Sequence, residues 1–388
     1  MKKSLLIAAL AVFTMASCSK DQVVETPQET IAFNVVANKA TKAADVYCNA
    51  NPMSEFAVWA SYGGESYFAD ERVAVSVSEG TTTCTPDVVR YWPAFDKSQT
   101  MTFFALAGTT TDLDWTEKGV TAPTVAYTIK DAVAEQEDVL FARSATFDDK
   151  SSAPVAMNFR HALSLIEFKA KNESDNLHVV ISNVCATGVK KSGTFTFPTN
   201  PTTQNFQKHD DNSTDEDNTY NTDEKWETSG ENNGEYVVAL ANNVSVPKDK
   251  TTYKSLTYLA AEDGTTANYY SRSMLLMPQA TDTKVAGDEI YIGVYCQIYN
   301  MAGNTYVEAT DALLYKGWAL VPIDINWEMG KKYIYTFLFK NGNGGTQGGD
   351  DPKDPKPGTD PVLFQIDYTV SVDDFDLILD QEVEMVKK

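Results

Sequence analysis

The sequence has 388 residues and carries 54 acidic against 32 basic side chains, a formal net charge of −22 at pH 7. No basic stripe is evident, which argues against nucleic-acid binding, and a strongly negative surface suits a particle that must not adhere to anionic neighbours. The length leaves room for two domains. The 18 Phe, 19 Tyr and 6 Trp favour strands, and no stretch sustains a helical period over twelve residues. We therefore expect an all-β protein.

Residues 1–18 have the features of a bacterial lipoprotein signal peptide. Lys2 and Lys3 form a basic start, and residues 5–15 are apolar but too short to span a membrane. The sequence MASC at 15–18 resembles a lipobox, in which small residues precede the Cys that carries the lipid. Cys18 is thus the predicted lipidation site, with an ordinary secretory signal peptide and a chance Cys as the alternative.

Residues 19–42 are expected to form a polar tether followed by a short strand. Ile31, Phe33 and Val35 alternate with other residues and share one face of that strand. The small, polar residues that follow favour an exposed and easily cut segment. A trypsin-like protease would cut there after Lys39 or Lys42, the alternative being an ordinary linker.

Two β-domains are predicted, over residues 43–190 and 191–340. Short strands separated by turn signals are typical of β-sandwiches. The predicted strands are Phe56–Ser61, Val73–Val77, Met101–Leu106, Thr124–Ile129, Leu163–Ala170 and Leu177–Val184 in the first domain, and Gly193–Phe197, Glu235–Ala241, Ser273–Met277, Glu289–Tyr299, Leu313–Leu320 and Lys332–Phe339 in the second. The acidic insertion at 204–234 fails as a calcium loop and is expected to be a mobile surface loop.

The sequence offers little support for catalysis, a metal or a cofactor. The remaining cysteines form no CxxC pair; Cys296 is expected to be a buried thiol, and a bond between Cys48 and Cys84 stays open. Of the three histidines, His161 lies among core-like residues, whereas His178 and His209 lack a ligand pattern. No common catalytic motif is present. We expect no enzyme, although sequence alone cannot place two carboxylates across a cleft, as a glycosidase would need.

The chain ends with a linker and a long amphipathic strand. Residues 341–361 are rich in Gly, Pro and Asp and are predicted to be a tether, which at full extension spans roughly 65–70 Å. Alternate residues of the segment 362–388 are apolar until the register flips at Asp373. These apolar residues are Val362, Phe364, Ile366, Tyr368, Val370 and Val372. The strand either folds back onto its own domain or completes the sheet of another subunit by strand addition.

Several segments, in order along the chain, resemble the fimbrillins, the type V pilins of Bacteroides-type bacteria. They are the lipobox, IAFNVVANKATKAAD (31–45), YWP (91–93), FFALAG (103–108), NFRHALSLIEF (158–168), LLMPQ (275–279), NWEMGKKYIYTF (326–337) and DPVLFQIDYTVSVDDF (360–375). The resemblance implies two transthyretin-like β-sandwich domains and a lipidated precursor carried to the cell surface. Cleavage after a basic residue would remove the first strand, and the C-terminal strand of a neighbouring subunit would fill the groove. The family typically cuts after Arg, whereas this chain offers Lys.

What the resemblance implies here is a structural pilin subunit that polymerises into surface fimbriae and supports adhesion. Ile31, Phe33 and Val35 would belong to the removable strand, and the six apolar residues of the terminal strand would be the donor positions. The Lys42–Ala43 bond would be the processing site. The expected partners are related pilin subunits, the lipoprotein export machinery, a trypsin-like surface protease and an adhesion ligand. The alternatives are a fimbrial anchor or tip subunit, or a monomeric surface lipoprotein that binds glycans.

Overall fold

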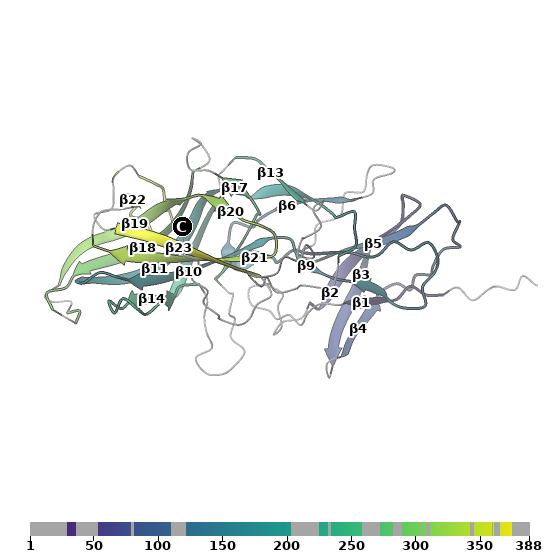
Figure 1. Cartoon of the computed structure of the whole chain (residues 1–388), viewed down its shortest axis with the longest axis horizontal. Helices are drawn as coiled ribbons and strands as arrows, with labels where there is room; N and C mark the ends of the chain where they lie inside the picture. The colour runs from purple at the N-terminus through teal and green to yellow at the C-terminus, as the bar shows by residue number, and fades with distance from the viewer. Residues whose placement is uncertain are drawn as a thin grey trace, which may run out of the picture.

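The computed structural model confirms an all-β architecture. It describes residues 29–35, 53–78, 81–109, 122–202, 225–231, 234–257, 272–281, 289–303, 305–307, 311–341, 345–358, 360 and 365–374. The chain is elongated, with strands β1 to β5 near one end and β10, β11, β18, β19 and β21 towards the other (Figure 1). Within the described part of the chain, no helix is long and apolar enough to cross a membrane.

A six-stranded sheet in the order β4-β3-β2-β5-β7-β9 forms the first end of the molecule. Its strands are β2 (Glu55–Tyr62), β3 (Glu65–Ser78), β4 (Thr81–Pro86), β5 (Met101–Ala107), β7 (Leu140–Arg143) and β9 (Arg160–His161). A parallel pair, β1 (Phe33–Val35) with β8 (Val155–Met157), accompanies it. Strands β2 and β5 are apolar on both faces, which indicates that the sheet is covered on both sides.

One face of this sheet and the β1–β8 pair enclose what we term the first core. It contains alternate residues of the central strands, such as Phe56 and Val58 of β2 and Phe103 of β5. The intervening residues Trp59 and Phe104 point to the opposite face and join a larger, second core. This division follows from the two-residue period of a strand.

The second core continues through a three-stranded sheet, β13-β12-β6, into a sandwich of two five-stranded sheets. The three strands are β6 (Thr124–Thr128), β12 (Ser192–Thr196) and β13 (Lys225–Ser229). The 3₁₀ turn η1 (Val133–Glu135) also contributes a buried valine.

One sheet of the sandwich has the order β15-β10-β21-β23, with β16 also paired to β10, and the other has the order β14-β11-β18-β19-β22. The first contains β10 (Ser164–Asn172), β15 (Lys254–Ser255), β16 (Met274–Leu276), β21 (Lys331–Lys340) and β23 (Gln365–Asp374). The second contains β11 (Leu177–Val189), β14 (Gly234–Val246), β18 (Ile290–Asn300), β19 (Ala312–Ile323) and β22 (Thr346–Gln347), and a small pair joins β17 (Ala280–Thr281) to β20 (Ile325–Asn326).

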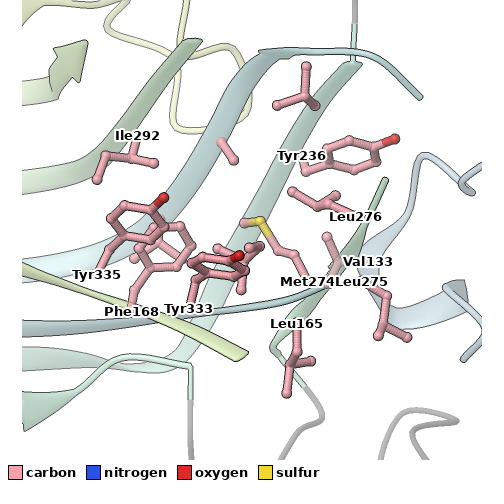
Figure 2. Close-up of a cluster of buried hydrophobic side chains, with 14 of the residues drawn as sticks. Val133, Leu165, Phe168, Tyr236, Met274, Leu275, Leu276, Ile292, Tyr333 and Tyr335 are labelled. Atoms are coloured by element: carbon pink, nitrogen blue, oxygen red, sulfur yellow. The ribbon is translucent and has the colours of Figure 1, made fainter. Parts of the chain in front are cut away.

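Figure 2 shows how the two sheets meet. Phe168 of β10 and Tyr335 of β21 lie with Ile292 of β18 in one apolar cluster. In β11 a register shift between Ile181 and Asn183 moves the inward positions from odd to even residue numbers, and a second between Thr187 and Val189 moves them back. These bulges keep the strand apolar towards the core along its whole length.

Strand pairing crosses the domain boundary expected at residues 190 and 191. Strands β10 and β11, expected in the first domain, pair with β21, β14 and β18 of the second. Strand β6 pairs with β12, which follows the boundary. The prediction that 204–234 is wholly a surface loop was also wrong, because β13 lies within it and pairs with β12; residues 203–224 are outside the described part.

Candidate functional site

Residues 29–35, which end in β1, have backbone partners on two sides, and β1 itself pairs with β8 over three residues. The amide of Ile31 donates to the carbonyl of Arg90 at 2.8 Å, and the amide of Trp92 donates to Glu29 at 3.0 Å. On the other side, the amide of Val155 donates to the carbonyl of Ala32 at 2.7 Å. The main chain of residues 29–35 thus lies between two segments of the first end of the molecule.

Three side chains of residues 31–35 are deeply buried. Ile31, Phe33 and Val35 are only 3%, 7% and 7% exposed and all belong to the first core. The ring of Phe33 makes edge-to-face contacts with Phe56 at 6.1 Å and with Phe103 at 5.6 Å between centroids. A short segment near the chain start therefore supplies three core side chains, as the alternation predicted.

Cys84 of strand β4 lies beside this segment. It is a free, half-buried thiol that packs against the first core. Burial raises the pKa of the Cys84 thiol, and the nearby backbone of Val35 opposes that rise. The pKa of the Cys84 thiol therefore depends in part on β1.

At the other end of the chain, β23 is docked on its own sandwich. It pairs antiparallel with β21 over ten residues, from Lys340 opposite Gln365 to Lys331 opposite Asp374. Its apolar face becomes less covered along the strand: Ile366 is 4% exposed, Tyr368 and Val370 are half-buried, and Val372 is 41% exposed. No strand pairs with the outer edge of β23 in the described part of the chain.

Not all of the predicted site residues can be placed. Cys18, Lys42, Ala43, Val362 and Phe364 lie outside the described residues. The structure gathers Ile31, Phe33 and Val35 in the first core, and it sets the remaining donor residues along the edge of the sandwich. The two groups are therefore on different sheets of one chain.

The predicted tether is not free over most of its described length. This segment begins with β22 at the edge of the sheet that contains β18 and β19. The residues that follow β22 pack on the outer face of the sheet, where the indole of Trp318 donates to the carbonyl of Asp351 at 2.8 Å. Tyr295 donates to the carbonyl of Asp350 at 3.0 Å. Sequence reasoning missed both anchors. The only available signal was a Trp at an outward position of a strand.

Titratable side chains elsewhere have structural contacts. His161 lies 2.9 Å from the carboxylate of Asp138, and both are buried, which fits the structural role expected of His161. His178 stacks on Tyr306 with ring centroids 4.0 Å apart, and burial lowers its pKa. His209 lies outside the described part.

Cys185 and Cys296 are buried free thiols, which confirms the prediction for Cys296. Among the described residues, no group of three or more His, Cys, Asp or Glu is placed to hold a metal ion.

These features define a β-sheet protein in which the described predicted site residues lie on two strands, β1 and β23, or just before β1. The model of the fimbrillin-like family matches residues 39–350. The chain therefore belongs to the fimbrillin-like family, whose members are fimbrial structural proteins. Both β1 and β23 lie outside the matched range.

A solved structure shares this fold. A fimbrial protein of Bacteroides vulgatus superposes with a TM-score of 0.54 at 14% identity, covering 89% of this chain and 99% of that chain. At this identity the likeness concerns the fold alone. A putative cell adhesion protein of Parabacteroides distasonis gives a TM-score of 0.47 at 10% identity, covering 89% of this chain and 98% of that one. No curated protein sequence matches this chain.

Proposed function

We propose that this protein is a polymerising fimbrial subunit that exchanges strands after its first strand has been removed. The observation that carries the proposal is the placement of β1. Ile31, Phe33 and Val35 complete the first core, while β1 pairs with β8 over only three residues. Loss of such a segment leaves an apolar groove that another strand of the same pattern can fill.

The C-terminal strand has the matching pattern. Val362, Phe364 and Ile366 repeat the aliphatic–aromatic–aliphatic order of Ile31, Phe33 and Val35. The far end of β23 is weakly covered, since Val372 is 41% exposed. Detaching β23 exposes little new apolar surface at that end, whereas insertion into a vacant groove buries the apolar face of the strand. Such head-to-tail joints do not close and build an open filament.

Processing and surface attachment follow from the N-terminal segment. Cys18 carries the lipid in the precursor, and a protease cuts the Lys42–Ala43 bond, which separates β1 from the remaining chain. The mature subunit then resides in a fimbrium at the cell surface. Because the cut follows Lys, the protease must accept Lys at that position.

The docked position of β23 also fits the alternative, a monomeric surface lipoprotein that keeps both end strands. The two functions differ in the mature N-terminus. In the strand-exchange function it is Ala43, and in the alternative it is the lipidated Cys18.

The test is the N-terminal sequence and intact mass of protein sheared from cells. Ala43 as the first residue, in ladders that resist detergent, supports strand exchange. A lipidated Cys18 on a monomer that forms no ladder would contradict it. Val362→Asp or Phe364→Asp should then abolish the ladder while the circular dichroism and melting of the monomer stay unchanged.

A further inference from the structure

The segment before β23 is built into the sandwich as a strap, by which we mean residues 345–358 together with Asp360. Trp318 is fully buried beneath it and exchanges backbone bonds with it: the amide of Gly348 donates to Trp318 at 2.8 Å, and the amide of Trp318 donates to Gly349 at 3.4 Å. The side-chain amide of Asn183 donates to Pro352 at 3.3 Å. Three strands of one sheet, β11, β18 and β19, thus hold the strap.

The outer face of this sheet is apolar under the strap. Cys185, Tyr295, Trp318 and Leu320 form a small buried cluster separate from the two cores. A β-carbon added at Gly348 would lie 2.6 Å from the β-carbon of Trp318 and 2.6 Å from the carbonyl oxygen of Pro355. Glycine is therefore required for the strap to lie this close to the sheet.

The strap also closes on itself next to the start of β23. The amide of Gly358 donates to the carbonyl of Gln347 at 2.7 Å, and the amide of Gln347 donates to the carbonyl of Asp360 at 2.8 Å. Gln347 belongs to β22 and pairs with β19. The last anchored residue, Asp360, is thus five positions before Gln365, where β23 begins.

We propose that the strap fixes the point from which the C-terminal strand extends, so that only a short stretch of chain connects a detached strand to the sandwich. With the strap in place, the free chain begins at Asp360 and its five residues to Gln365 span at most about 18 Å. Without the strap, the free chain begins at Lys340 and those 25 residues span up to about 90 Å. In a fibre, this short connecting segment sets a close and uniform spacing between subunits. That consequence rests on the proposed function, whereas the strap itself is a property of the monomer.

The test uses the full chain with β23 released by Ile366→Asp. Two probes, at Lys316 on β19 and at Thr369 on β23, report the distance between the sandwich and the released strand. Flexible chains of nine residues from Asp360 or 29 residues from Lys340 have end-to-end distances of about 17 Å and 30 Å. Adding Gly348→Val, which removes the strap from Trp318, should therefore widen the distance distribution about 1.8-fold. The matched control is Gly303→Val, because nothing lies within 4 Å of a β-carbon there.

An equally broad distribution of probe distances with and without Gly348→Val would overturn the proposal that the strap anchors the chain. Amide hydrogen exchange gives a second reading that does not require β23 to be released. Gln347, Gly348 and Gly358 should be protected in the parent chain and exposed by Gly348→Val, or by the milder pair Tyr295→Phe with Asn183→Ala; absence of protection in the parent contradicts the proposal. A mature protein with a protected strap that forms no ladder refutes the proposed function and leaves the strap standing.

Discussion

Replacing Phe33 by Ala tests whether β1 is a structural part of the first core. The Phe33 ring is 7% exposed and has two edge-to-face aromatic partners, so its removal leaves a cavity among rigid rings. Phe→Ala changes in such cores lower the free energy of unfolding by about 3–5 kcal/mol. Asn34→Ala is the matched control, because Asn34 is the exposed neighbour on the same strand and should change stability by less than about 0.5 kcal/mol.

The assay is urea unfolding of the uncut chain, followed by tryptophan fluorescence. Trp92 is a local reporter: it is 3% exposed and lies 5.7 Å from the ring of Phe103, a neighbour of Phe33. A loss below about 1 kcal/mol for Phe33→Ala would refute the reasoning, since the remaining core would then have to close over the cavity. A loss of similar size for Asn34→Ala would show instead that β1 acts through its backbone.

Three further outcomes follow from particular contacts. Ile366→Asp should release β23 from β21, whereas Val372→Asp should not, because the first side chain is 4% and the second 41% exposed; hydrogen exchange of the β21 amides distinguishes them. Cys84 should react faster with iodoacetamide in a chain that begins at Ala43, as peptide mapping would show. Loss of the covering strand exposes the sulfur and removes part of the burial that raises its pKa, and this outweighs the loss of the pKa-lowering backbone of Val35. Hydrogen bonds from the hydroxyl and amide of Thr252 and the amide of Thr251 lower the pKa of Asp249 to about 2. The stabilisation of this turn is therefore present above pH 4 and is lost as the pH falls from about 4 to 2. The NMR chemical shift of the Thr252 amide should follow this pH dependence, and Asp249→Asn should abolish it.

The strands were predictable because alternation is a local property. The ten residues of β23 alternate, and Met101–Leu106 is a short, nearly continuous apolar run, which is the other local sign of a strand. The partners of the strands were not predictable in the same way. Nothing local in Thr124–Thr128 indicates that it pairs with residues 192–196, a pairing that crosses the boundary expected at residue 190.

The strap shows a different limit of sequence reasoning. Gly and Pro are typical of flexible tethers, but they also suit a chain that must lie close to a flat surface with a fixed backbone. Gly348 serves the second purpose, because it lies against Trp318, and Pro355 is buried in the same segment. Composition cannot separate the two cases. The deciding partner, Trp318, is 30 residues away in the sequence.

The two end strands are held differently, and under the proposed function this difference makes the cut the controlling step. Residues 31–35 insert three side chains into the first core and pair with β8 over three residues, whereas β23 lies at a sheet edge and pairs with β21 over ten residues. An uncut subunit therefore keeps its groove filled but still has a strand to donate. We expect the double variant Lys39→Ala and Lys42→Ala, mixed with cut subunits, to join one fibre end and stop growth there, because a heterologous chain needs a donor and a groove on every member. Mean fibre length, measured by electron microscopy, should fall as the uncut fraction rises, and unchanged lengths with uncut subunits inside the fibres would show that β1 does not block the groove.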